Sequence, residues 1–136
     1  MLSLGLVLEA EAGRMTERFD QVTALNHRLR ERVAPLGVVL SRADSSPYIL
    51  SLSFPGIPSE IILNAMSAKG CYFSAGSACS ARSRHKSHVI AWLTEDEDLR
   101  NGAIRVSFSW QNTLEEIDRF GDELSLTLTQ LRKVIR

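Results

Sequence analysis

The chain has 136 residues, of which 44% are hydrophobic and 24% charged, and this length and composition predict one compact domain. Sixteen basic residues balance sixteen acidic ones, which removes the usual electrostatic argument for a nucleic-acid or anionic-membrane partner. No apolar stretch reaches the roughly 18 residues of a membrane span. The apolar opening runs directly into Glu9 and Glu11 without a basic start, so we expect no signal peptide. Two cysteines are too few for a disulfide scaffold, and since we expect no export signal, we expect a protein of the reducing cytosol.

The first predicted element is a long amphipathic helix that stops before Pro35 and Gly37. Its apolar residues recur at helical spacing between charged ones: Met15, Phe19, Val22, Leu25, Leu29 and Val33.

Two strands are expected next, at residues 38–40 and 48–54. The second strand alternates apolar residues with Ser51 and Ser53, which is the period-two pattern of a strand with one buried face. The loop between the two strands is too short for a crossover, so they should pair antiparallel.

A second helix should begin at Pro58, because a proline lacks the N–H that a helix start leaves unpaired. Gly70 can supply its left-handed C-terminal cap. Residues 71–73 then read as a short strand, residues 74–84 as a small, polar loop, and residues 87–93 as a short helix.

A third strand is predicted at residues 103–108, with Arg105 and Ser107 on its polar face. Thr113 and Glu116 have the spacing of a capping box. The final helix carries an apolar face of Leu114, Ile117, Phe120, Leu124, Leu128 and Leu131. We therefore expect an α+β fold, a two-layer sandwich in which a small, mainly antiparallel sheet packs against helices.

Cys79 is the first candidate for chemistry. It lies in the polar loop, ahead of a basic cluster of Arg82, Arg84, His85, Lys86 and His88. Nearby cations lower the pKa of a thiol and favour the nucleophilic thiolate. From composition alone, an unreactive cysteine in a turn is the more common situation. Cys71, beside Tyr72 and Phe73, is most simply a core residue.

Other sites have weaker support. Cys71, Cys79, His85 and His88 have the right chemistry for zinc, but they lack the close paired spacing of structural zinc sites, so we expect no metal. Backbone N–H groups at 76–77 could help to bind an anion, although one glycine is weak evidence. Arg105 could hold a carboxylate through two parallel hydrogen bonds, but an ordinary solvated arginine is the simpler interpretation.

Five blocks of sequence, in this order, resemble the C-terminal small domain of a NifS-like cysteine desulfurase, a class V aminotransferase of the fold-type I pyridoxal-phosphate enzymes. The most specific of them is the hexapeptide at 75–80. The blocks are residues 53–56 (SFPG), 69–80 (KGCYFSAGSACS), 87–89 (SHV), 104–107 (IRVS) and 115–118 (EEID).

The resemblance implies that residues 1–136 form one small domain and that residues 1–12 come from the connection to a large domain. It implies that Cys79 is the catalytic thiol, which takes sulfur from L-cysteine as a persulfide and leaves L-alanine, in pathways such as iron–sulfur cluster assembly. It also implies that Arg105 binds the carboxylate of the substrate. The family's cofactor is pyridoxal phosphate, and a sulfur-acceptor protein and a separate large domain are the implied partners.

The departures concern the cofactor and the loop. The three lysines, Lys69, Lys86 and Lys133, do not lie in the context of the family's cofactor lysine, so we expect this chain not to bind the cofactor covalently and to be inactive alone. Residues 84–86 (RHK) replace the Leu-Glu-Pro of many relatives. Without the large domain, the apolar residues 2–8 would lack the surface against which they pack in the family. Exposed apolar area favours self-association, so we expect a homo-oligomer.

Three other interpretations stay open. The chain could be a non-enzymatic remnant that serves as a dimerisation or sulfur-accepting module. It could be one half of a split enzyme, or a relative of selenocysteine lyases.

Overall fold

The computed structural model describes residues 5–6, 12–75 and 88–135. The expectations for residues 2–8 and for the loop that contains Cys79 fall largely or entirely outside these ranges. Among the described residues, no helix has the length and apolar character needed to cross a bilayer.

The described strands form one antiparallel sheet in the order β1-β2-β4-β3. The central pair, β2 (Ile49–Ser53) and β4 (Ala103–Ser107), is matched over five residues, from Ile49 opposite Ser107 to Ser53 opposite Ala103. The outer strands are much shorter, with β1 at Val38–Val39 and β3 at Ser74–Ala75. The antiparallel pairing of β1 with β2 is as predicted.

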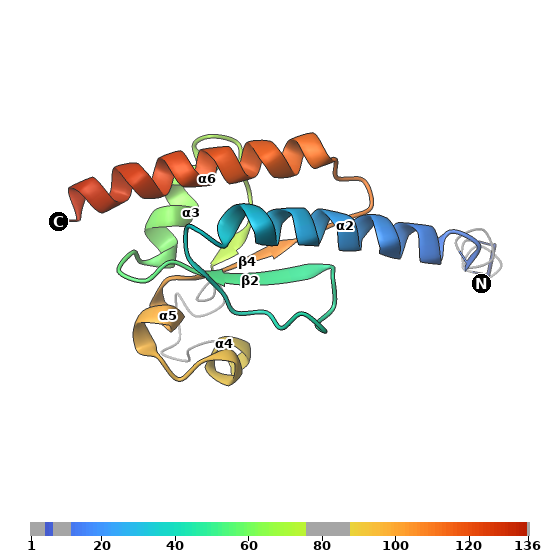
Figure 1. Ribbon diagram of the computed structural model, residues 1–136, viewed down its shortest axis with the longest axis horizontal. Helices are drawn as coiled ribbons and strands as arrows, with labels where there is room; N and C mark the ends of the chain where they lie inside the picture. The colour runs from blue at the N-terminus through green and yellow to red at the C-terminus, as the bar shows by residue number, and fades with distance from the viewer. Residues whose placement is uncertain (1–4, 7–11, 76–87, 136) are drawn as a thin grey trace.

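Long helices cover one face of this sheet, and two short helices lie on its other side (Figure 1). The covering helices are α2 (Met15–Val33), α3 (Ser59–Ser67) and α6 (Leu114–Val134), and the short ones are α4 (His88–Leu93) and α5 (Glu97–Asn101). The α+β class and the packing of a small antiparallel sheet against helices are therefore confirmed.

Helices α2 and α6 lie side by side and run in the same direction (Figure 1). Arg28 on α2 pairs with Asp118 on α6, and one turn further along Arg32 pairs with Asp122. Because both members of the second pair lie four residues after those of the first, the helices are parallel. Lys69 bonds Glu123 at 2.8 Å and joins the end of α3 to α6 in the same way.

The hydrophobic core lies between the sheet and the long helices. It is built from the apolar faces that the sequence predicted: Val22, Leu25, Leu29 and Val33 of α2, Leu50 and Leu52 of β2 with Phe54 after it, Ile104 and Val106 of β4 with Phe108 after it, and Ile117, Leu124 and Leu128 of α6. Ile57, just before α3, and Ile62 and Met66 of α3 complete it.

Local signals also behaved as expected in one long helix and at two helix ends. Residues 15–33 form the first long helix, as the periodicity indicated. The capping box of Thr113 and Glu116 begins α6. Gly70 follows α3 with a φ of 76°, the left-handed conformation that a glycine adopts without strain.

Two local predictions were wrong. The strand expected at 71–73 lies instead at 74–75, because the N–H of Cys71 bonds the carbonyl of Met66 at 3.1 Å and still belongs to the end of α3. Strand β2 was expected to bury one face only, but Ser51 and Ser53 are 3% and 0% exposed. The unpredicted helix α5 covers this second face, where the Ser53 hydroxyl donates to the carbonyl of Leu99 at 2.6 Å.

Candidate functional site

The candidate site is the face of the sheet that points away from the long helices, with Arg105 at its centre. Arg105 is the middle residue of β4, and its neighbours Ile104 and Val106 are buried against the helices. Since successive side chains of a strand point to opposite faces, Arg105 projects from the other face, where it is exposed. This confirms the placement predicted from the alternation of residues 103–108.

Two serines flank Arg105 in the same row of the sheet. Ser51 of β2 lies opposite Arg105 on one side, and Ser74 of β3 lies opposite it on the other. Side chains paired in this way share a face and have Cβ atoms about 5 Å apart. The sheet therefore presents a hydroxyl, a guanidinium and a second hydroxyl in one line.

The guanidinium of Arg105 makes no hydrogen bond or ion pair with any residue that the structure describes. Other arginines of the chain are engaged: Arg30 bonds Asn26 and the carbonyls of Ser41 and Arg42, and Arg100 bonds the carbonyl of Thr94. Among the described residues nothing occupies the planar set of donors of Arg105, and such a set can bind a carboxylate or phosphate through two parallel hydrogen bonds. The backbone of Arg105 is paired with β2 on one side and β3 on the other, so the Cα from which the guanidinium extends is held in place.

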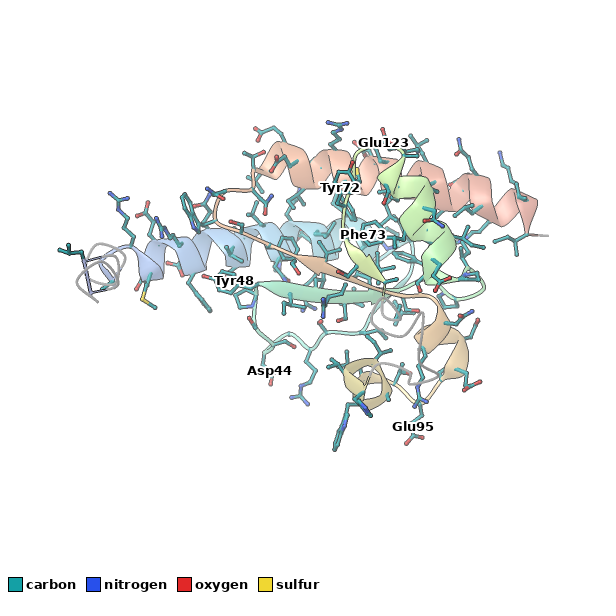
Figure 2. All side chains as sticks on the ribbon, turned by 180° about the vertical axis from the view of Figure 1, so that it is seen from behind. Asp44, Tyr48, Tyr72, Phe73, Glu95 and Glu123 are labelled. Atoms are coloured by element: carbon teal, nitrogen blue, oxygen red, sulfur yellow. The ribbon has the colours of Figure 1, made fainter. Side chains whose placement is uncertain are left out.

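The short helices border this face. Helix α5 begins with a side-chain cap, because Asp96 accepts hydrogen bonds from the N–H groups of Asp98 and Leu99. A cavity of about 430 Å³ lies at α4 and the residues after it, and its lining includes His88, Trp92 and Glu95. Glu95 is labelled in Figure 2 on the side of the sheet away from the long helices.

Cys71 lies on the helix side of the sheet, away from Arg105. It was expected in the core, and the structure places it half-buried at the core's edge, beside a cavity of about 230 Å³ that Phe120 and Arg119 also line. Tyr72 and Phe73 are labelled next to α6 in Figure 2. Phe73 packs edge-on against Phe120 with 5.7 Å between ring centroids, whereas Tyr72 is exposed.

The described lysines do not fit a covalent pyridoxal-phosphate site. Lys69 is paired with Glu123 in the helical layer, and Lys133 lies in the last turn of α6. Neither belongs to an element of the face that carries Arg105. The third lysine, Lys86, is outside the described residues.

Several predicted site residues cannot be placed. Cys79, the basic residues 82–86 and the proposed anion site at 76–77 all lie outside the described residues. The zinc ligand set also includes two of these positions, Cys79 and His85. Within the described ranges, no group of three potential metal-binding side chains is brought together.

Ser51 and Ser74 were not singled out from the sequence. The alternation in β2 already put Ser51 on the polar face, and Arg105 was on the polar face of its own strand. Which residue of one strand faces which residue of another depends on the register of the sheet, and that requires the structure.

Comparison with known proteins defines the family. The sequence pattern described as aminotransferase class-V matches residues 1–120, so the chain belongs to the aminotransferase class-V family. It is 31% identical to the cysteine desulfurase of Gluconacetobacter diazotrophicus over 98% of this chain and 34% of that protein. It is 33% identical to the cysteine desulfurase IscS of Vibrio campbellii over 87% of this chain and 30% of the relative.

Solved structures agree with this family. A NifS-like protein superposes with a TM-score of 0.75 at 27% identity, over 89% of this chain and 30% of its own. A NifS-like protein from Rickettsia africae superposes with a TM-score of 0.76 over 92% of this chain, and at 19% identity that likeness concerns the fold alone. The chain spans about a third of the length of the curated relatives it matches.

Proposed function

We propose that residues 1–136 form the small C-terminal domain of a pyridoxal-phosphate-dependent cysteine desulfurase, with residues 1–12 belonging to the connection to a large domain. The observation that carries the proposal is Arg105, a solvent-facing guanidinium without a partner among the described residues, fixed at the centre of the sheet. The cysteine desulfurases among the relatives support the same assignment.

In this proposal Arg105 binds the α-carboxylate of L-cysteine. A bidentate guanidinium–carboxylate pair fixes the orientation of the amino acid as well as its position. A central strand suits this role because its backbone is hydrogen-bonded on both sides. Lysine at the same position would keep the charge but lose the planar pair of donors.

Cys79 would be the sulfur acceptor. Strand β3 ends at Ala75, directly beside the row that contains Arg105, and four residues of chain span at most about 14 Å. The Cys79 thiolate would attack the substrate sulfur as the Cβ–S bond breaks. The electron pair of that bond stays with Cβ, which takes up a proton, so the products are a Cys79 persulfide and L-alanine.

The rest of the enzyme would have to hold the cofactor. Pyridoxal phosphate supplies the electron sink that weakens the Cβ–S bond, and neither described lysine is suited to bind it. The isolated chain should therefore release no sulfide from L-cysteine when it is mixed with pyridoxal phosphate. Steady sulfide release by the isolated chain would contradict the proposal that another part of the enzyme holds the cofactor.

A chimera tests the proposed function directly. Residues 1–136 replace the matched third of the Gluconacetobacter diazotrophicus cysteine desulfurase, and L-cysteine is the substrate. Alanine is measured, together with the sulfide that dithiothreitol releases by reducing the persulfide. We expect activity that Cys79→Ser abolishes and that Cys71→Ser, the matched control, retains. Arg105→Lys should raise KM for L-cysteine by about tenfold or more.

A folded chimera without activity would contradict the proposal and would favour a non-enzymatic module. Activity that survives Cys79→Ser would contradict the assignment of Cys79 as the nucleophile. Persulfide on Cys79, detected by mass spectrometry after one turnover, would identify the thiol from which a sulfur-acceptor protein draws.

A further inference from the structure

Ser51 is the closer of the two serines that flank Arg105 in the sheet. Backbone-bonded pairs alternate with unbonded ones along an antiparallel ladder, and the N–H of Phe54 bonds the carbonyl of Gly102, three pairs away. Ser51 and Arg105 therefore form an unbonded pair, in which Cα atoms lie about 4.5 Å apart. The backbone N–H and carbonyl of Arg105 point to β3 instead, so its pair with Ser74 is of the bonded kind, with a wider spacing of about 5.5 Å.

The hydroxyl of Ser51 is buried, and it makes no hydrogen bond with any residue that the structure describes. Ser51 is 3% exposed, and its backbone N–H is already used, because it bonds the Ser41 hydroxyl at 2.8 Å. Ser53, two residues further along the same face, differs in that its hydroxyl donates to the carbonyl of Leu99 at 2.6 Å. Buried side-chain hydroxyls normally have a hydrogen-bond partner. For Ser51, the strand pairing places the donor groups of Arg105 beside it.

A guanidinium has more donors than a carboxylate uses. It carries five N–H groups, and a carboxylate bound through two parallel hydrogen bonds occupies two of them. The long side chain of a free arginine samples many rotamers, and binding a carboxylate must stop this motion at a cost in entropy. A hydrogen bond from the guanidinium to a hydroxyl on the neighbouring strand limits the motion. Rotations about the side-chain bonds of Arg105 suffice to form such a bond across an unbonded pair.

We propose that Ser51 is a positioning residue for Arg105, an inference that rests on the proposed function. The Ser51 hydroxyl accepts a hydrogen bond from one N–H of the guanidinium while two others hold the α-carboxylate of L-cysteine. Because the carboxylate is held in the same way before and during the chemical step, Ser51 contributes to substrate binding and leaves the rate of that step unchanged. Ser74 contributes less, because its pair with Arg105 has the wider spacing.

The test compares Ser51→Thr with Ser51→Val in the chimera with the Gluconacetobacter diazotrophicus enzyme. The two new side chains have nearly the same shape, but only threonine keeps the hydroxyl. Ser51→Val should raise KM for L-cysteine about fivefold and leave kcat within about twofold, whereas Ser51→Thr should stay within about twofold of the parent in both. The matched control is Ser107→Val, which removes a hydroxyl from the same face of β4 in the row of Ile49 and should leave KM unchanged.

A binding measurement separates this role from catalysis. L-alanine, the product of the proposed reaction, carries the same α-carboxylate, and isothermal titration calorimetry gives its Kd for the chimera loaded with pyridoxal phosphate. This Kd should rise about fivefold in Ser51→Val and stay within about twofold of the parent in Ser51→Thr and Ser107→Val.

The outcomes distinguish the role of Ser51 from the proposed function. Equal KM and Kd values for Ser51→Thr and Ser51→Val would overturn the positioning role, even in a fully active chimera. An equal rise in Ser107→Val would overturn it as well. A chimera that binds L-alanine with the expected differences and forms no persulfide would refute the proposed function and retain the role of Ser51. A chimera that does not bind L-alanine would overturn both.

Discussion

Arg28 and Asp118 are ninety residues apart in sequence, yet they join the two long helices through two hydrogen bonds. Arg28 Nε donates to Asp118 Oδ1 at 2.8 Å, and Arg28 Nη2 donates to Oδ2 at 3.1 Å. These bonds are the main reason that the pKa of the Asp118 carboxyl lies below its usual value. They also raise the pKa of Arg28.

The Arg28–Asp118 pair predicts a pH-dependent contribution to stability. A carboxyl with a lowered pKa in the folded state stabilises that state above its ordinary pKa, and the contribution is lost as the pH falls through the lowered value. Arg28→Met should therefore reduce the free energy of unfolding at about pH 6 more than at about pH 3. Urea unfolding at both pH values measures the difference.

Arg42 and Asp44 provide the control for this experiment. Their side chains are also doubly bonded, at 2.9 Å each, and the bond from Arg42 lowers the pKa of Asp44. Because they are two residues apart on a surface loop, the same pair can form in the unfolded chain, so the lowered pKa is largely common to both states and Arg42→Met should change stability little at either pH. Equal effects of the two variants would contradict the role assigned to Arg28.

Gly102 marks a close approach between two backbone segments. A Cβ at this position would lie 2.5 Å from the carbonyl oxygen of Phe54, whose N–H bonds the Gly102 carbonyl at 3.3 Å. Gly102→Ala should therefore destabilise the chain by about 1–3 kcal/mol in urea unfolding. Gly13→Ala is the control, because a Cβ there meets nothing within 4 Å. Equal stability of the two variants would argue against the contact.

The first turn of α6 depends on the capping box. The Thr113 hydroxyl accepts from the N–H of Glu116 at 3.2 Å, and the Glu116 carboxylate accepts from the N–H of Thr113 at 3.0 Å. Thr113→Ala should cost about 1 kcal/mol in free energy of unfolding, and Thr113→Ser should restore most of it. Thr129→Ala, in the interior of the same helix, should not destabilise, since alanine is the better helix former there.

The two cysteines should differ in reactivity toward iodoacetamide. Cys71 is half-buried at the edge of the core, which restricts the approach of a reagent. Cys79 lies in sequence next to a basic cluster that favours the thiolate. Peptide mass spectrometry at increasing labelling times should find Cys79 modified first. Earlier modification of Cys71 would contradict the assignment of Cys79 as the reactive thiol.

The sequence predicted the long elements well because several independent signals agreed on them. Helix α2 has an apolar period and a Pro35–Gly37 stop, and α6 has an apolar period and a capping box. Short elements carry fewer signals. Helix α5 was missed although Asp96 is a good N-cap, because five residues are too few to show a period. The predicted position of β3 was wrong because the N–H of Cys71 still bonds a carbonyl at the end of α3.

For the candidate site, the sequence could supply residues but not their neighbours. Arg105 was assigned to the polar face of its strand from alternation alone. That Ser51 and Ser74 share its row follows from the pairing of three strands that are distant in sequence. The burial of Ser51 and Ser53 likewise depends on covering segments that no local pattern in β2 reveals.

The parallel helices α2 and α6 begin at different levels, and this offset has an electrostatic consequence. Thirteen residues of α2 precede Arg28, whereas four residues of α6 precede its partner Asp118, so α2 begins nine residues earlier. If two parallel helices began at the same level along their axes, their positive N-terminal ends would lie together and their dipoles would repel each other. Here the N-terminus of α6 lies beside the middle of α2, about 14 Å from the like pole. That separation exceeds the screening length of about 8 Å at physiological ionic strength, so the two helices can run in the same direction without mutual dipole repulsion at their starts.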